Sequence, residues 1–292
     1  MNDKLPNILI TGSSGFVGRA LIKNLAKDSN LFLVSRDKNF SYPGAKVFCG
    51  DLADQAFSKK IILGVDTVFY LAGYKKNIAH HMKYPNDFIL GNIEPLTSFL
   101  RAAKDSPVKR IIYLSSTNVG LYKEGEKDGY VVGKYINELI LKTFSDQYGI
   151  DVKIVRSAGI YGPGDNFDPE TANFIPSIIN KVYESGGEVS VWGTGKRKMQ
   201  FVFIDDLVSN LVAVLKSGGN FFVVGNSEAL AVNDIVGRII ELFGKKRVIK
   251  NDQAKPDKPT QLFEFNNVEK LKFSFDKGLA KTVDYYKTLG LV

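Results

Sequence analysis

The chain has 292 residues, 44% of them hydrophobic and 24% charged, which is enough to bury one large core or two closely packed ones. No apolar run approaches the roughly 18 residues that cross a bilayer, and the first four residues lack a signal-peptide pattern, so we expect a cytoplasmic protein without a membrane partner. The formal charge of +8 is scattered along the chain, which predicts a solvated surface with one or two functional cations and no nucleic-acid partner.

Apolar runs alternate with helical patterns through the first half of the chain. This alternation predicts an α/β fold, a Rossmann-type doubly wound parallel sheet covered by helices. The expected strands cover residues 8–11, 31–35, 45–49, 67–71, 111–115 and 152–156, and the helices between them include 95–104 and 130–144.

The first turn, Thr11-Gly12-Ser13-Ser14-Gly15-Phe16-Val17-Gly18, follows the first expected strand and opens a helical pattern. A strand, a glycine turn and a helix in this order form a pyrophosphate cradle, because glycines allow close backbone approach and the helix offers free N–H groups. The sequence therefore predicts a dinucleotide site at Gly12, Ser14, Gly15, Phe16, Val17 and Gly18.

The end of the second expected strand bears on the choice between NAD and NADP. In a dinucleotide fold this position reads the adenosine ribose, where an acid holds the 2′-hydroxyl and an arginine suits a 2′-phosphate. The strand ends in Ser35, Arg36 and Asp37. Ser35 and Arg36 favour NADP, while Asp37 keeps NAD open as the alternative.

Two further strand ends border the same crevice. Asp51 and Leu52 follow the third strand, where a carboxylate can accept a hydrogen bond from the adenine amino group. Leu71, Ala72 and Gly73 end the fourth strand, where small residues let a cofactor lie flat. Because both segments fall at the carboxyl ends of parallel strands, we expect them to bind the cofactor.

Tyr130 and Lys134 are four residues apart, on one face of an expected helix. Tyrosine is a poor base at its ordinary pKa of about 10, but a neighbouring ammonium and a positive nicotinamide favour the phenolate. Ser115 and Ser116 end the preceding strand, where a hydroxyl can bond the same substrate oxygen. The pattern predicts a catalytic group of Ser116, Tyr130 and Lys134.

The second half of the chain changes in character from Gly162 onward. Expected elements are a helix at 173–185, strands at 189–191, 201–204 and 221–224, a helix at 206–216 and a final helix at 278–288. We therefore predict a dinucleotide-binding domain from 1–162 and about 201–226, and a smaller, interleaved α/β substrate-binding domain from about 163–200 and 227–292.

In this order the motifs resemble the extended short-chain dehydrogenases/reductases of the NAD-dependent epimerase/dehydratase family, and its nucleotide-sugar 4-epimerases. The residues that carry the resemblance are the glycine turn, Gly50-Asp51-Leu52, Leu71-Ala72-Gly73, Asn92, Ser115-Ser116, Tyr130 with Lys134, 156–164 and 193–206. The resemblance implies an NAD- or NADP-dependent enzyme, a nucleotide-sugar substrate, and a homodimer built from helices 95–104 and 130–144.

The resemblance also implies roles for individual residues. Tyr130 would be the acid and base, Lys134 would anchor the nicotinamide ribose and lower the pKa of Tyr130, and Ser116 would polarise the substrate oxygen. Further cofactor contacts would come from Lys75, Asn92, Ser115, Tyr130, Lys134, Ser157 and Gly159. Substrate contacts would come from Ser116, Thr117, Asn118, Asn173, Arg197 and Lys258.

Several positions depart from the family pattern. The loop between Ser116 and Tyr130 is short. Met199 stands where nucleotide-sugar enzymes carry a diphosphate-binding arginine, which leaves the neighbouring Arg197 as a candidate replacement, and Lys258 stands where a second such arginine is expected. Thr117 and Asn118 replace the Asp-Glu pair of the dehydratases, which argues against dehydration. The single Cys49, His80 and His81 make neither an acid–base pair for epimerase-reductase chemistry nor a metal site.

The sequence favours an NAD(P)-dependent nucleotide-sugar epimerase that acts at carbon 4, resembling UDP-glucose 4-epimerase, by Tyr-assisted hydride transfer through a keto intermediate. The alternative is an NADPH-dependent reductase of a keto-sugar nucleotide or of a non-nucleotide ketone or aldehyde. A cofactor-sensing or RNA-binding scaffold without catalysis is a third hypothesis, against which Ser116, Tyr130 and Lys134 argue.

Overall fold

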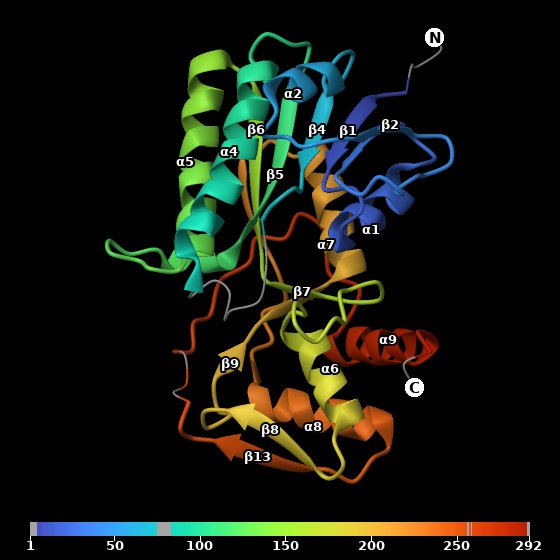
Figure 1. Cartoon of the computed structure of the whole chain (residues 1–292), viewed down its shortest axis with the longest axis vertical. Helices are drawn as coiled ribbons and strands as arrows, with labels where there is room; N and C mark the ends of the chain where they lie inside the picture. Colours follow the sequence, from blue (N-terminus) through green and yellow to red (C-terminus); the bar gives the residue numbers. More distant parts are fainter. Residues whose placement is uncertain (1–4, 75–82, 256, 258, 291–292) are drawn as a thin grey trace. The chain divides into compact units, whose positions relative to one another are not determined.

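A computed structural model describes residues 5–74, 83–255, 257 and 259–290 (Figure 1). The chain divides into two compact units. Unit 1 consists of residues 1–156 and 211–222, and unit 2 consists of residues 157–210 and 223–292.

Unit 1 is built on a seven-stranded parallel sheet in the order β11-β6-β5-β4-β1-β2-β3, the arrangement of a Rossmann-like α/β fold. Its strands are β1 (Asn7–Thr11), β2 (Asn30–Ser35), β3 (Lys46–Cys49), β4 (Thr67–Tyr70), β5 (Arg110–Ser116), β6 (Asp151–Ser157) and β11 (Phe221–Val224), of which the last two continue by one and two residues into unit 2. The strand order reverses between β1 and β4, so the carboxyl ends of these two strands flank the crevice where such sheets bind ligands.

Helices cover both faces of this sheet, α2, α4 and α5 on one side and α1 on the other (Figure 1). Their bounds are α1 (Phe16–Leu25), α2 (Gln55–Ile61), α4 (Pro85–Ala103) and α5 (Gly129–Tyr148), with a short 3-10 helix, η1 (Thr117–Leu121), after β5. Both faces are therefore buried: Leu9 joins a core with Tyr70 and Phe99, while Ile8 and Ile10, which alternate with Leu9 along the strand, are at most 2% exposed.

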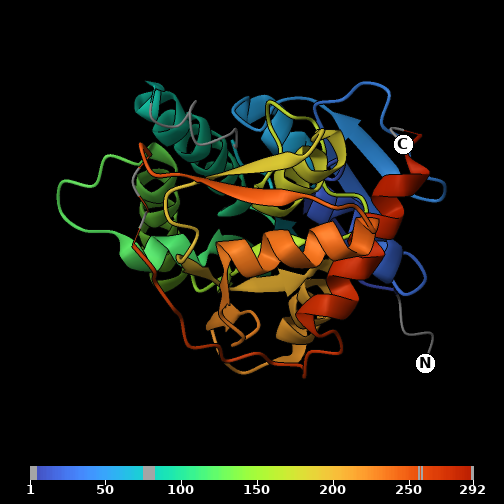
Figure 2. The same cartoon turned by 90° about the horizontal axis from the view of Figure 1, so that it is seen from below.

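Unit 2 contains three two-stranded sheets and four helices among its described residues. The strand pairs are β7 (Gly159–Tyr161) with β10 (Phe201–Phe203), β9 (Lys198–Met199) with β12 (Leu230–Ala231), and β8 (Glu188–Trp192) with β13 (Val248–Asp252), which Figure 2 shows as neighbouring yellow and orange arrows. The helices are α6 (Phe174–Glu184), α7 (Ile204–Ala213, which ends in unit 1), α8 (Val232–Phe243) and α9 (Phe275–Thr288), and η2 (Val214–Lys216) follows α7.

An extended segment, residues 260–274, precedes α9, and we call it the C-terminal strap. Side chains of unit 2 bind its backbone at several points. The Asp206 carboxylate accepts from the N–H groups of Lys272 (2.8 Å) and Phe273 (3.1 Å), and the Asn210 amide oxygen accepts from the N–H of Glu269 (2.9 Å). The strap, which the structure describes throughout, forms no strand pairing, so its backbone N–H groups need acceptors elsewhere. These side chains supply them and thereby fix its path.

The structure confirms the predicted fold class and corrects two helices. The helix expected at 95–104 begins at Pro85, because this proline occupies the first helical turn, where its missing N–H costs nothing, and Pro95 is carried inside the helix. The last helix begins at Phe275 rather than 278, because the Ser274 hydroxyl caps it by accepting from the N–H of Lys277. The segment 201–203 pairs with β7 and not with the large sheet.

Within the described residues, no helix combines the length and the apolar character that crossing a bilayer requires.

Asp206→Ala tests the attachment of the C-terminal strap. Asp206 is 2% exposed, so its removal leaves two backbone N–H groups without an acceptor, and we expect the free energy of unfolding to fall by about 2–3 kcal/mol in urea denaturation. The neighbouring, exposed Asp205 gives the matched control, since Asp205→Ala should change stability by less than about 0.5 kcal/mol. Equal losses in the two variants would contradict this account.

Candidate active site

The glycine turn lies between β1 and α1 and has no room for side chains. Gly12 has φ +68°, and a Cβ there would lie 3.1 Å from the Ala72 nitrogen. A Cβ on Gly15 would lie 3.1 Å from the Gly12 oxygen, and one on Gly18 would overlap the same oxygen. The three glycines therefore allow the tight packing of the turn on itself and on Ala72, and Phe16 and Val17 are the first residues of α1 after it.

Thr11 joins the turn to the end of β4. Its hydroxyl accepts from the N–H groups of Leu71 and Ala72, each at 3.1 Å. The predicted segment Leu71–Gly73 is thereby brought beside Gly12, on the neighbouring strand end.

The end of β2 is a second polar point beside the turn. The Ser35 and Ser14 hydroxyl oxygens lie 2.8 Å apart, and Ser35 Oγ also accepts from the N–H of Asp37 at 3.0 Å. Asp37 Oδ1 accepts from the N–H of Asn39 at 2.9 Å, so one carboxylate oxygen of Asp37 belongs to its own loop. Arg36 is exposed.

The third strand end holds Cys49, Asp51 and Leu52. Leu52 is buried in the core, whereas Asp51 is exposed and its Oδ1 accepts from the N–H of Ala53 at 2.9 Å. Cys49 is exposed, and its sulfur lies 3.7 Å from the Arg36 oxygen. Asp51 therefore follows the edge strand of the sheet, next to the Ser35 strand end.

The start of α5 faces the end of β5, where the predicted catalytic residues gather. The Asp128 side chain caps α5 by accepting from the N–H groups of Tyr130 and Val131, which orients the first turn. The Tyr130 and Ser116 side chains are hydrogen-bonded to each other. Thr117 is buried, and the N–H of exposed Asn118 donates to Ser116 Oγ at 3.2 Å.

Burial determines the protonation of Tyr130 in the protein alone. Desolvation raises the pKa of Tyr130 to about 12, the hydrogen bond with Ser116 lowers it, and the nearby Asp128 carboxylate raises it. Tyr130 therefore keeps its proton at neutral pH.

The Lys134 ammonium is buried against β5. Lys134 is 6% exposed, its Nζ donates to the Leu114 oxygen at 2.9 Å, and it lies 4.6 Å from the centroid of the Tyr113 ring. A Cβ on Gly73 would lie 3.6 Å from this Nζ and 3.3 Å from Asn92 Oδ1. The ends of β4 and β5 thus meet α4 and α5 around Lys134.

Asn92 is a buried connector in α4. Its side chain accepts from the N–H of Tyr74 at 3.2 Å and donates to the oxygens of Tyr74 (3.1 Å) and Phe88 (2.7 Å), while its backbone oxygen accepts from Asn137 Nδ2 at 3.0 Å. It fixes the chain just after Gly73. The predicted cofactor contact Lys75 lies outside the described residues.

A network that the sequence analysis missed lies one turn beyond Lys134. Glu138, 7% exposed, accepts from the Ser115 hydroxyl at 2.5 Å and from Arg156, whose Nη2 lies 2.6 Å and whose Nε lies 2.9 Å from its oxygens. The Arg156 guanidinium also lies 5.0 Å from the centroid of the Phe221 ring. Glu138 follows Lys134 at the same four-residue interval, a signal that could have identified it.

The remaining predicted residues lie in unit 2. Ser157 is buried at the end of β6, and a Cβ on Gly159 would press on the Phe201 ring. Asn173 directly precedes α6, and its side chain forms no capping bond. Lys258 lies outside the described residues.

Arg197 has a distinctive environment in unit 2. Its Nε is buried without a hydrogen-bond partner among the described residues, and burial lowers the pKa of its guanidinium while Asp257 raises it. Asp257 is held by Thr194, whose N–H (3.1 Å) and hydroxyl (2.5 Å) both donate to its carboxylate. Trp192 is 56% exposed at the end of β8, with Lys255 Nζ 4.1 Å from its ring centroid.

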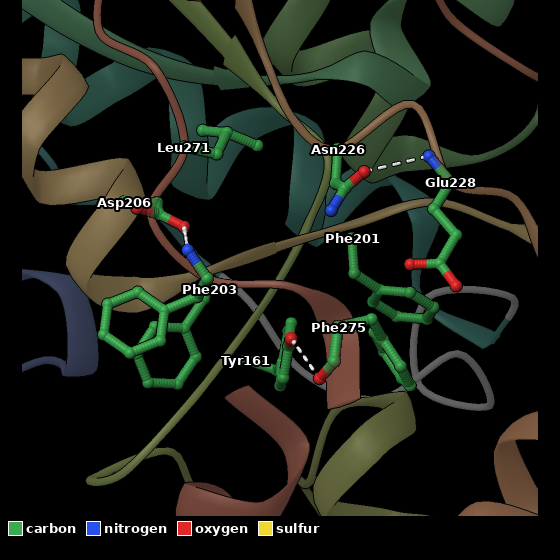
Figure 3. A pocket seen from close by; sticks show the side chains of 9 residues that line it. Tyr161, Phe201, Phe203, Asp206, Asn226, Glu228, Leu271 and Phe275 are labelled. Atoms are coloured by element: carbon green, nitrogen blue, oxygen red, sulfur yellow. Dashed lines mark hydrogen bonds between the residues drawn. The ribbon is translucent and has the colours of Figure 1, made fainter. Parts of the chain in front are cut away.

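A small cavity and a larger open hollow lie among the described residues of unit 2, and neither is lined by a predicted site residue. The one in Figure 3 is a cavity of about 10 Å³ within an aromatic cluster, where the Tyr161 hydroxyl donates to the Phe275 oxygen at 3.0 Å and Asp206 binds the strap; it has room for one water molecule. The other is an open hollow of about 810 Å³ along the C-terminal strap.

Comparisons with known proteins place these features in a family. The family model described as "NAD dependent epimerase/dehydratase family" matches residues 8–225. The chain is 24% identical to dTDP-4-dehydro-6-deoxy-D-allose reductase of Streptomyces sp (96% of both chains covered) and 26% identical to GDP-L-fucose synthase 1 of Arabidopsis thaliana (98% and 94% covered). Its fold is similar to that of a UDP-glucose 4-epimerase from Thermotoga maritima, with TM-score 0.85, 23% identity and coverage of 97% and 99%.

Arg156→Met tests the buried ion pair. The substitution leaves the Glu138 carboxylate buried without its cation, so we expect the free energy of unfolding to fall by about 3–5 kcal/mol in urea denaturation. Adding Glu138→Leu to this variant removes the unpaired charge and should restore part of the loss. A double variant no more stable than Arg156→Met would show that the ion pair is not the source of the loss.

Proposed function

The chain belongs to the NAD-dependent epimerase/dehydratase family of extended short-chain dehydrogenases/reductases, a family of enzymes, and we propose that it reduces a keto group of a nucleotide-activated sugar, at carbon 4, with NADPH. The observation that carries the proposal is the buried Tyr130, hydrogen-bonded to Ser116 at the end of β5 and raised in pKa to about 12. A phenol that keeps its proton at neutral pH is ready to act as a general acid.

The residues present fit a dinucleotide. Gly12, Gly15 and Gly18 allow a turn so tight that a Cβ at each would press on neighbouring backbone, and the first turn of α1 offers N–H groups to a pyrophosphate. Ser14, Phe16 and Val17 would line this cradle, and Gly73 would leave space along the strand ends beside Lys134. When bound, the nicotinamide supplies the hydride.

The chain's own residues would handle the proton and the substrate oxygen. Tyr130 donates its proton to the carbonyl oxygen as that oxygen gains negative charge, and Ser116 holds the same oxygen by a hydrogen bond. Lys134, fixed by the Leu114 oxygen, would place a positive charge beside the developing phenolate and bind the nicotinamide ribose. Asn92 would keep the end of β4 against α4 and α5.

The residues at the end of β2, where the adenosine ribose would lie, favour NADP over NAD. Ser35 faces Ser14 and is followed by exposed Arg36, whereas one oxygen of Asp37 is engaged by the N–H of Asn39. An arginine binds a phosphate dianion bidentately, and an acid at this position would repel it. Asp51 would lie near the adenine.

Unit 2 offers groups for an anionic, aromatic substrate portion. Exposed Trp192 supplies an apolar ring face, and Lys255 lies over it. The pKa of Lys181 is lowered first by burial and then by Lys255, which places a second cation nearby. With Arg197, these groups suit a nucleoside diphosphate. A nucleotide sugar is also what the names of the two curated relatives indicate for those proteins.

A 4-epimerase is the second candidate. The strand end Leu71-Ala72-Gly73-Tyr74 resembles that of UDP-galactose 4-epimerases, and the same Tyr130 can remove a proton in the oxidising direction once a positive nicotinamide lowers its pKa. The basic residues at the end of β2, where the adenosine ribose would lie, favour NADPH and therefore the reductase.

We also propose a homodimer through α4 and α5. These helices pack against each other, and each carries an exposed leucine, Leu90 (43%) on α4 and Leu139 (47%) on α5. Pairing two copies of this face would bury both.

An assay against a panel of 4-keto and hydroxyl forms of UDP-, TDP- and GDP-sugars tests the function. A reductase oxidises one NADPH for each keto substrate that it reduces, so the NADPH absorbance at 340 nm falls. An epimerase converts the hydroxyl form and leaves the cofactor unchanged overall. Turnover of simple ketones alone would overturn the nucleotide-sugar assignment, and failure of every substrate in the panel to react would overturn the proposal.

Tyr130→Phe tests the acid. We expect kcat to fall by about 10²–10⁴-fold while cofactor binding, followed by protein fluorescence, is retained. Since the pKa of Tyr130 is raised to about 12, the acid form persists below that pH, so wild-type reduction should not decline through loss of this proton between about pH 6 and 10. A decline with an apparent pKa near 7 that disappears in Tyr130→Phe would contradict the protonated state.

A further inference from the structure

Arg19 is an exposed residue of α1 that folds back toward the glycine turn. Its Nε donates to the Ser14 oxygen at 2.9 Å, and its guanidinium carbon lies 5.3 Å from the centroid of the Phe40 ring. Within the described part of the chain, no hydrogen bond uses the two terminal amino groups of Arg19. The side chain is held in place while four of its N–H donors stay available.

The partner ring belongs to the loop that follows β2. This loop is set by three bonds: Ser35 Oγ accepts from the N–H of Asp37, Asp37 Oδ1 accepts from that of Asn39, and the Asp37 oxygen accepts from the N–H of Phe40 at 3.2 Å. Phe40 is 8% exposed although it lies in a surface loop. The same loop begins with Arg36.

Arg19 in α1 and Arg36 in the loop after β2 therefore lie on either side of the hydroxyl pair formed by Ser14 and Ser35. Arg19 is bonded to Ser14, Ser14 meets Ser35 at 2.8 Å between hydroxyl oxygens, and Arg36 follows Ser35. Lys38 adds a third cation to the loop, and one oxygen of each nearby acid, Asp37 and Asp51, is bonded to the backbone of its own loop. Three exposed cations around a pair of bonded hydroxyls suit a phosphate monoester.

We propose that Arg19 is a second phosphate-binding arginine, which holds the 2′-phosphate of NADP from the α1 side while Arg36 holds it from the β2 loop. The inference rests on the proposed dinucleotide site at the glycine turn. Phe40 is a positioning residue in this arrangement, because its ring attracts the Arg19 guanidinium and helps to hold it beside the turn. A residue that binds only the 2′-phosphate would act on the choice between NADP and NAD.

The test measures dissociation constants of NADP+, NAD+ and 2′,5′-ADP by calorimetry at low salt. Arg19→Ala should weaken NADP+ and 2′,5′-ADP about tenfold and leave NAD+ within twofold. Phe40→Leu should weaken NADP+ by about two- to fivefold, again without affecting NAD+. Lys23→Ala, which removes an exposed cation one turn further along α1, should change none of the three and controls for net charge.

Each other outcome has a definite meaning. Arg36→Ala serves as the comparison: if it weakens NADP+ and Arg19→Ala does not, the inference is wrong and the dinucleotide site stands. Equal weakening of NADP+ and NAD+ by Arg19→Ala would assign Arg19 to the turn's structure and also overturn the inference, as would tighter binding of NAD+ than NADP+ by the wild type. If the wild type binds neither dinucleotide, the proposed function itself fails.

Discussion

The side-chain bonding of α5 to β5 is the constraint on which the site depends. Three buried polar residues of one helix face, Lys134, Asn137 and Glu138, each reach this strand. Lys134 donates to the Leu114 oxygen, Asn137 donates to the Tyr113 hydroxyl, and Glu138 accepts from the Ser115 hydroxyl. Such groups are costly to bury unless they are paired, so the helix can occupy only the register that satisfies all three. That register brings Tyr130 to Ser116.

The glycine turn is held by the same kind of constraint on the other side of β4. The Thr11 hydroxyl bridges two N–H groups at the end of β4, and Gly12 has the left-handed backbone that lets the chain pass close to Ala72. Asn92 and Lys134 then border Gly73 from α4 and α5. The tight backbone at Gly12 and the side-chain bonding around Gly73 together fix the strand ends of β1 and β4, where such sheets bind ligands.

The parts predicted from sequence are those that local chemistry determines. The six predicted parallel strands fall within one residue of the observed bounds, because continuous apolar runs and glycine turns are local signals. The predicted start of α4 is wrong. A proline favours the first turn of a helix, and the prediction assigned this place to Pro95, whereas Pro85 occupies it. Glu138 went unnoticed because its partner Arg156 lies 18 residues away, and the burial of Lys134 and the raised pKa of Tyr130 depend on packing that no spacing reveals.

The buried tyrosines of the core have a consequence for the protein in alkali. Desolvation raises the pKa of Tyr70, Tyr113 and Tyr161 above the ordinary value, as it does for Tyr130. Below about pH 10 these phenols are neutral whether the chain is folded or not, but above it only the unfolded chain releases their protons, so unfolding becomes proton-releasing and stability declines with rising pH. The phenolate absorbance of these buried tyrosines near 295 nm would consequently lag in the native protein and then appear abruptly, so that this part of a spectrophotometric titration would report loss of the fold itself.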